Sequence, residues 1–185
     1  KSIQAIEKAM MQEQRLFLIT QKNPEIEEPG QEDLYPIGTI AEIKQLVKLP
    51  KNIVRVLVEG IERAQLVSLE ENAEYLDAQI AVFEVEEELD ETVKEAMLRS
   101  IKELFVRYCN SNKQISKELA GQILELEEIE KVLDQISIHL PIRYEDRQKI
   151  LEAVSLEDRY EVVGMILTNE IEIMEIGARL QSKVK

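Results

Sequence analysis

Cysteine and histidine are almost absent from the sequence, since the 185 residues include one of each, Cys109 and His139. A single cysteine excludes a disulfide within the chain, and we expect it to be an ordinary thiol near a helix end. A metal site needs several converging His, Cys or carboxylate ligands, so the sequence predicts no bound metal. We interpret His139, close to Pro141, as a partly buried residue at a joint and not as a catalytic base.

Glycine is also scarce, and none of the six glycines begins the G-x-x-x-x-G-K-[ST] loop that holds nucleotide phosphates. No serine has the glycine-rich, apolar surroundings of a nucleophile, and Ser116 followed by Lys117 is better interpreted as a helix start. Paired carboxylates are abundant, but pairs arise by chance in so acidic a chain. The sequence therefore predicts a chain that is not itself an enzyme and holds no cofactor.

Long apolar runs are missing as well, because none reaches the roughly 18–20 residues that span a bilayer. The sequence shows no signal peptide. The net charge is -14, from 37 acidic and 23 basic residues. Binding to nucleic acid or to an anionic membrane needs clustered Lys and Arg, so this balance disfavours both partners. We expect a protein of the reducing cytoplasm.

The first half has the alternation of apolar and polar residues that is typical of strands. Residues 3–11 predict a short amphipathic helix, and the unbroken apolar run at 16–19 predicts a strand buried on both faces. A polar loop is expected at residues 21–33. Another strand is expected over residues 75–85, with an inner face made by Leu76, Ala78, Ile80 and Val82.

Residues 35–67 hold the clearest pattern, two alternating runs around a turn at 49–52. The pattern predicts a β-hairpin, and Asn52 tolerates the positive φ that such a turn requires. We expect one face of the first strand to carry Ala41, Ile43, Gln45 and Val47. The other face, with Glu42, Lys44 and Lys48, is expected to face water.

The period changes near Glu86, where acidic residues at 86–88 and 90–91 predict a solvated hinge that leads into a helix amino terminus. It separates a β-rich subdomain, residues 1–87, from a helical bundle, residues 88–185. Apolar residues at three- and four-residue steps predict helices at about 93–108, 116–126, 128–136 and 144–154, then a long helix from 156. The expected fold class is α+β, with a small sheet and one helix followed by the bundle.

The apolar stripe of the last helix is wider than a small bundle needs at its far end. Either this helix packs along its own bundle, or its last turns need a partner, as in a coiled coil. The partner would be a second chain or more of this chain. The residues concerned are Ile173, Ile176 and Leu180.

A family resemblance rests on the order of these patterns. Gly38 and Thr39, the turn at Leu49 and Pro50, and the run RVLVEG at 55–60 followed by Arg63 resemble the amino-terminal substrate-binding domain of Lon, the ATP-dependent protease. The second half adds residues 139–141, residues 148–152 and Arg159. Asn52 stands where the family often has Gly, and Tyr160 where it has Leu. Domains of this kind begin with an apolar strand ahead of the first helix, whereas the first helix is expected almost at the start of this sequence. Because that strand has no counterpart here, we expect an exposed sheet edge that is open to strand pairing.

The resemblance implies a non-catalytic domain that recognises substrates and helps to organise the oligomer of an ATP-dependent, Lon-type serine protease of protein quality control. It implies unfolded or damaged proteins as partners, together with ATPase and protease domains in a hexamer that uses ATP and Mg. The alternative is a stand-alone interaction or scaffold module of the same fold. Nucleic-acid binding through this chain is a distant third.

Substrate contact is expected from exposed apolar residues in two loops. Packing of each residue beneath its own loop is an equally strong alternative. The residues are Leu34, Tyr35, Pro36, Leu49 and Pro50.

Overall fold

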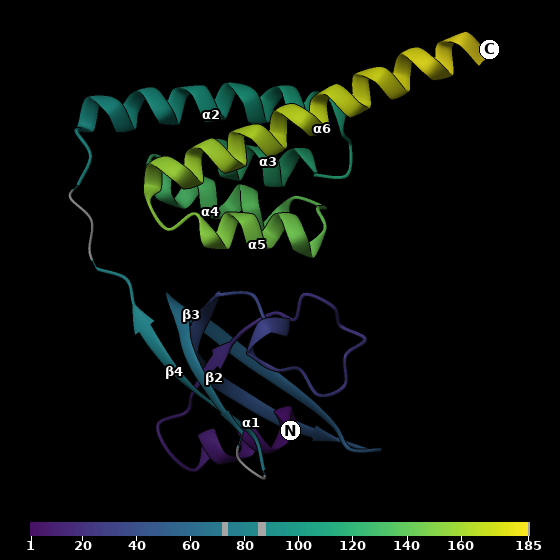
Figure 1. The fold of residues 1–185 in the computed structure, drawn as a ribbon. Helices are drawn as coiled ribbons and strands as arrows, with labels where there is room; N and C mark the ends of the chain where they lie inside the picture. The colour runs from purple at the N-terminus through teal and green to yellow at the C-terminus, as the bar shows by residue number, and fades with distance from the viewer. Residues whose placement is uncertain (72–73, 85–87, 185) are drawn as a thin grey trace. The chain divides into compact units, whose positions relative to one another are not determined.

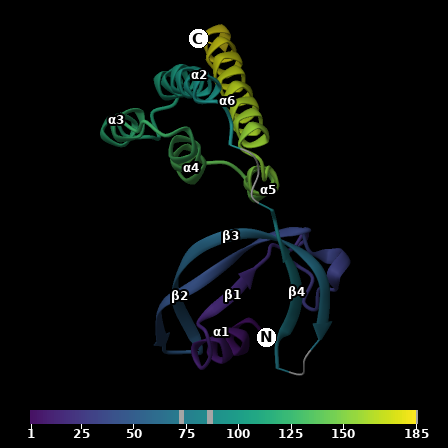
Figure 2. The same cartoon turned by 90° about the vertical axis from the view of Figure 1, so that its left-hand side faces the viewer.

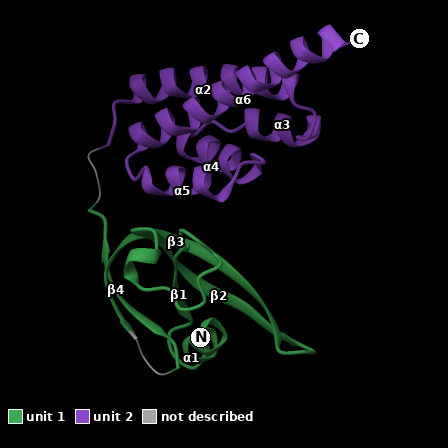
Figure 3. Ribbon diagram, turned by 45° about the vertical axis from the view of Figure 1, so that its right-hand side comes forward, with its two compact units in different colours: residues 1–85 green, residues 86–185 purple. Residues whose placement is uncertain are grey.

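A computed structural model describes residues 1–71, 74–84 and 88–184, and the chain divides into two compact units (Figures 1 and 3). The units are Lys1–Val85 and Glu86–Lys185. The first contains an antiparallel sheet and the second contains helices, the last of which is the longest. The expected α+β class is therefore confirmed.

The first unit is an antiparallel meander with the strand order β1-β2-β3-β4. Figure 2 shows β3 as a long arc that continues from the hairpin to its pairing with β4. The elements in chain order are α1 (Ser2–Met10), β1 (Arg15–Leu18), the 3₁₀ helix η1 (Gln31–Asp33), β2 (Ile37–Leu49), β3 (Ile53–Glu71) and β4 (Leu76–Val82).

Strand β1 corrects one expectation from the sequence. It pairs only with β2, through the register from Arg15↔Glu42 to Leu18↔Thr39, so it is an edge strand. Leu16 and Phe17 are half-buried and Leu18 is exposed. The strand is therefore not buried on both faces, and as an edge strand it also lacks a neighbouring strand that would shield its side chains on one side.

A β-bulge in β2 corrects a second expectation. Ile43 pairs with Val58 and Gln45 pairs with Leu57, so Lys44 is an extra residue in the ladder. A bulge reverses the side of the sheet that the following side chains occupy. Ala41 and Ile43 are accordingly buried, whereas Gln45 and Val47 are exposed and do not continue the same inner face. In β4 the inner face ends at Ile80, since Val82 is also exposed.

The second unit is a bundle of helices around one apolar core. The helices are α2 (Glu91–Ser111), α3 (Lys117–Leu124), α4 (Ile129–His139), α5 (Tyr144–Glu152) and α6 (Leu156–Val184). Their predicted order and approximate bounds are confirmed, and the Ser116 hydroxyl caps α3 by accepting from the amide of Leu119 over 3.1 Å. Fully buried side chains at the centre include Phe105, Tyr108, Leu133, Ile136, Val163 and Leu167.

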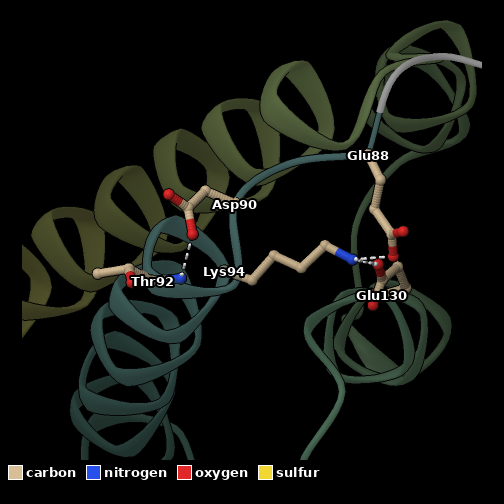
Figure 4. A network of polar contacts seen from close by, with 5 residues as sticks. All are labelled: Glu88, Asp90, Thr92, Lys94 and Glu130. Carbon is tan, nitrogen blue, oxygen red and sulfur yellow. Dashed lines mark hydrogen bonds and ion pairs between the residues drawn. The ribbon is translucent and has the colours of Figure 1, made fainter.

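Two residues of the acidic run, Glu88 and Asp90, make polar contacts at the start of α2 (Figure 4). The Asp90 carboxylate accepts from the amide of Thr92 over 3.1 Å, as expected for an acidic cap. Lys94 Nζ lies 3.0 Å from Glu88 Oε1 and 3.3 Å from Glu130 Oε1 on α4. The bond to Glu88 is the main reason that the pKa of Lys94 is raised. Glu88 is therefore a structural partner and not only a solvated charge, while residues 86 and 87 lie outside the described residues.

Candidate functional site

We call the distal half of the β2–β3 hairpin, residues 44–57, the arm. Strand β1 reaches β2 only as far as Glu42, and β4 reaches β3 only from Ala64 onward. Among the described strands, the two halves of the arm therefore pair only with each other. Figure 3 shows the tip of this hairpin standing clear of the other strands of its unit.

The two faces of the arm differ in exposure. Residues directly opposite each other in an antiparallel pair share a face, so the register places Gln45, Val47, Leu49, Ile53, Arg55 and Leu57 together. We call this set the outer face, and Ile53 and Leu57 on it are 54% and 59% exposed. The opposite face carries half-buried Leu46, Val54 and Val56.

The face of the arm opposite to the outer face, here called the inner face, contacts α1 through an ion pair. Lys48 Nζ lies 3.4 Å from Glu7 Oε1 on that helix. At the base of the arm, Lys44 lies 3.4 Å from Glu42 Oε1 and 3.3 Å from Glu59 Oε2, two carboxylates that face each other across the strands. Its bond to Glu59 is the main reason that the pKa of Lys44 is raised. These pairs anchor the arm and leave its outer face open.

The turn at the tip follows the prediction from its sequence. Asn52 has φ 58°, as expected, and Lys51 before it has φ 67°. Leu49 is half-buried and Pro50 is exposed. Two of the five predicted contact residues therefore lie at the tip of the arm, beside the more exposed Ile53.

The other three predicted contact residues lie at the opposite end of β2. Leu34 is only 5% exposed, so the expectation of an exposed residue is wrong for it. The segment is bonded into its unit, because the Tyr35 amide donates to the Thr20 carbonyl over 3.0 Å and the Leu66 amide donates to the Pro36 carbonyl over 2.8 Å. Tyr35 is half-buried and Pro36 is exposed. The 13 residues of β2 separate this segment from the arm's tip by roughly 40 Å at about 3.3 Å per residue.

A partly open cavity of about 430 Å³ lies in the first unit, and its lining mixes apolar residues with polar ones such as Lys1, Glu27 and Glu28. It is lined by side chains of both edge strands as well as by α1, Leu34 and β3. Its apolar lining includes Ile6, Leu16, Leu34, Leu66, Leu69 and Leu76. The cavity therefore adjoins the sheet edge that was expected to be open.

The last turns of α6 carry an exposed apolar row. The helix buries Val163, Leu167 and Ile171 in the bundle. Beyond these residues, Ile173 is 62% exposed and Leu180 is 58% exposed, and Ile176 between them is exposed as well. These residues are therefore not packed in the bundle, and a partner for the end of this helix stays a prediction.

The described residues contain no arrangement typical of an enzyme's metal centre. No group of three or more His, Cys, Asp or Glu among them is placed to hold a metal ion. Burial raises the pKa of the half-buried Cys109 thiol, which weakens it as a nucleophile. Of the helices described, none combines the length and the apolar character that crossing a membrane requires.

Comparison with known proteins agrees with the resemblance seen in the sequence. The profile of the ATP-dependent protease La (LON) substrate-binding domain matches residues 1–169. Lon protease of Lachnoclostridium phytofermentans is 46% identical over all 185 residues, and Lon protease 1 of Bacillus subtilis is 37% identical. The chain spans about a quarter of the length of these relatives, 23% and 24%.

A solved structure shows the same fold. The N-terminal domain of Mycobacterium avium complex Lon protease superposes with a TM-score of 0.65 at 21% identity, covering 92% of this chain and 84% of the other. The sheet, the bundle and the long final helix thus belong to a known architecture. Together with the match over residues 1–169, this fold shows that the chain belongs to the family of Lon substrate-binding domains.

Proposed function

We propose that this chain is a non-catalytic part of a Lon-type, ATP-dependent serine protease. Its role in that protease is to hold unfolded or damaged proteins. The observation that carries the proposal is the outer face of the arm, where exposed apolar side chains lie on a hairpin with unpaired outer edges. An unfolded protein exposes apolar side chains and unpaired backbone groups. Both can be accommodated on the arm, by apolar contact and by addition of a strand.

Weak contacts of this kind become useful when several copies act together. In a hexamer, as the resemblance implies, several arms would hold one substrate, and the effective local concentration would raise the overall affinity. The ATPase and protease domains, with their ATP and Mg, would belong to the remainder of the protein. The exposed row Ile173, Ile176 and Leu180 is the proposed contact to a second copy.

The cavity in the first unit is not part of the proposed substrate contact. Its lining is mixed, with Lys1, Glu27 and Glu28 beside the apolar residues, whereas the apolar side chains on the outer face of the arm are exposed. The proposal therefore rests on the arm and not on the cavity.

The test is the binding of a permanently unfolded protein, reduced and carboxymethylated α-lactalbumin, measured by surface plasmon resonance. Replacing Val47 and Leu57 by serine removes two apolar side chains from the outer face without touching the buried core. We expect the affinity to fall about tenfold, because apolar burial contributes about 25 cal/mol per Å². Ile138→Ser is the matched control, since Ile138 on α4 is also 59% exposed.

Equal affinity of the folded double variant, the control and the unchanged chain would remove the arm from the substrate contact. Tyr35→Ser tests the other predicted segment by the same measurement. If no variant changes the binding of unfolded protein while one folded partner binds tightly, the scaffold alternative would replace the proposal.

A further inference from the structure

The arm differs in charge from the chain that carries it. The whole sequence has a net charge of -14, yet residues 44–57 contain Lys44, Lys48, Lys51 and Arg55 and no acidic residue. Acidic residues return immediately outside the arm, at Glu42 and Glu59. The arm therefore combines exposed apolar side chains with the most basic segment of the first unit.

Two of these four cations are already neutralised within the unit. Lys44 lies between Glu42 and Glu59, and Lys48 lies beside Glu7. Lys51 and Arg55, in contrast, have no acidic partner among the described residues. The distal part of the arm therefore carries two cations whose charge is available to a ligand.

Arg55 has a defined place on the outer face. It lies opposite Val47, and two residues away on either side along β3 are Ile53 and Leu57. Side chains two positions apart on a strand share a face, so β3 presents the order apolar, cationic, apolar on its exposed side. Strand β4 does not cover this stretch, because its pairing with β3 begins at Ala64.

We propose that the arm prefers extended segments in which one acidic residue lies between two apolar residues, in the order apolar-x-acidic-x-apolar. The proposal rests on the proposed function and adds a sequence preference to it. A segment added along the free edge of β3 has the same two-residue period. Its acidic side chain then lies opposite Arg55, and its apolar side chains lie opposite Ile53 and Leu57.

The size of the preference depends on how exposed the ion pair is that Arg55 forms with the acidic residue of the bound segment. A charge-assisted hydrogen bond to a guanidinium is directional and favours a carboxylate over a neutral side chain. Exposed ion pairs contribute little, and salt screens them. We expect the preference for glutamate over lysine at the central position to be roughly three- to tenfold at low ionic strength, and smaller in high salt.

Three peptides test the preference, each with two copies of Leu-Ser-X-Ser-Leu joined by Gly-Ser, with glutamate, glutamine or lysine as X. Binding to the ¹⁵N-labelled 185-residue chain is followed by amide chemical shifts, which give both Kd and the location. We expect the shifts to concentrate in residues 44–57. The order of affinity should be glutamate, then glutamine, then lysine.

Charge reversal provides the decisive variant. Arg55→Glu should invert the order, so that the lysine peptide binds best. The control is Lys113→Glu, which makes the same change of net charge at an exposed residue of the second unit and should leave the order unchanged. Equal affinities of the glutamate and lysine peptides for the unchanged chain would overturn the preference, as would an unaltered order in Arg55→Glu.

Failure of the preference differs from failure of the proposed function. If the glutamine peptide binds the arm and the glutamate peptide binds no better, the substrate contact stands and only the acidic preference is wrong. If none of the peptides shifts the arm, the substrate contact itself is contradicted. Tighter binding of a single-stranded oligonucleotide than of the glutamate peptide to residues 44–57, followed by the same amide shifts, would assign the cations to nucleic acid and overturn the proposal.

Discussion

The side chain of Arg147 on α5 caps the carboxyl end of α4 by a hydrogen bond to the backbone of Leu140. Its Nη2 donates to the carbonyl oxygen of Leu140 over 2.7 Å, and its Nη1 donates to that of Ser137 over 3.1 Å. The last carbonyls of a helix have no partner within the helix. One planar guanidinium thus satisfies two of them and fixes the chain just before Pro141.

Replacing Arg147 by leucine keeps much of the side-chain stem and removes both donors. We expect the free energy of unfolding to fall by about 1–3 kcal/mol, because both carbonyl oxygens lose a charged donor, although that of Leu140 keeps its bond from the amide of Ile142. Urea unfolding followed by circular dichroism at 222 nm measures the change. Arg99→Leu is the control, since among the described residues Arg99 makes only an exposed pair with Glu95, and its loss should cost less than about 1 kcal/mol. An equal loss in both variants would contradict the capping role.

Gly38 marks a place where β2 approaches β1 too closely for a side chain. A Cβ at this position would overlap the carbonyl oxygen of Leu18 and lie 2.8 Å from Phe17 Cζ. We expect Gly38→Ala to destabilise the first unit by more than about 2 kcal/mol, because one of the clashing atoms is backbone. Hydrogen exchange of the β1 and β2 amides measures the local loss.

Gly164 is the matched control for Gly38. It lies in α6, and a Cβ there would meet no atom within 4 Å. Gly164→Ala should be neutral, or should stabilise the helix by up to about 1 kcal/mol because alanine has the higher helix propensity. Tolerance of alanine at both positions would show that β1 can move away from β2 at little cost.

The buried phenol of Tyr108 predicts a loss of stability in alkali. Burial, with a smaller effect from Glu170, raises the pKa of Tyr108 above 10.0. The unfolded chain therefore releases this proton at lower pH than the folded chain, and stability falls as pH rises above about 10. Burial of Cys109 acts in the same direction from about pH 9.

The measurement is the unfolding midpoint in urea between pH 8 and 10.5. Tyr108→Phe retains the ring that stacks near Phe105 at a centroid distance of 6.4 Å. Its stability should decline less steeply above pH 10 than that of the unchanged chain. Because Tyr108→Phe also loses the bond from Asn112, the slope with pH is compared and not the absolute stability. Identical slopes would contradict the assignment.

The exposed row on α6 predicts a change of oligomeric state. If Ile173, Ile176 and Leu180 contact a second copy, the chain should have a mass above the monomer value of 21.4 kDa in light scattering. Replacing Ile176 and Leu180 by glutamate should return it to the monomer, because charges at a coiled-coil seam are strongly unfavourable. Ile138→Glu, at an exposed site on α4, should leave the mass unchanged. A monomeric unchanged chain would exclude contact between copies through this row at the concentration measured.

Local signals in the sequence were sufficient for the helices. The cap at Ser116, the break at Pro141 and the three- and four-residue apolar steps each act within one or two turns, so their effect does not depend on distant residues. The same holds for the hairpin turn, where Asn52 adopts the positive φ that its side chain tolerates. The apolar residues at the tip of the arm were recognisable for this reason.

Only the tertiary structure decided which apolar side chains are exposed in the sheet. The extra residue Lys44 shifts the pairing of two strands, and this shift turns Val47 outward although its sequence pattern continues that of Ile43. Leu34 is buried and lines the same cavity as Ile6 and Leu66, which are distant in sequence, and β1 is an edge because of strand order. Sequence determines local conformation through neighbouring residues. The exposure of the arm's outer face depends on where β1 and β4 stop, which is a property of long-range pairing.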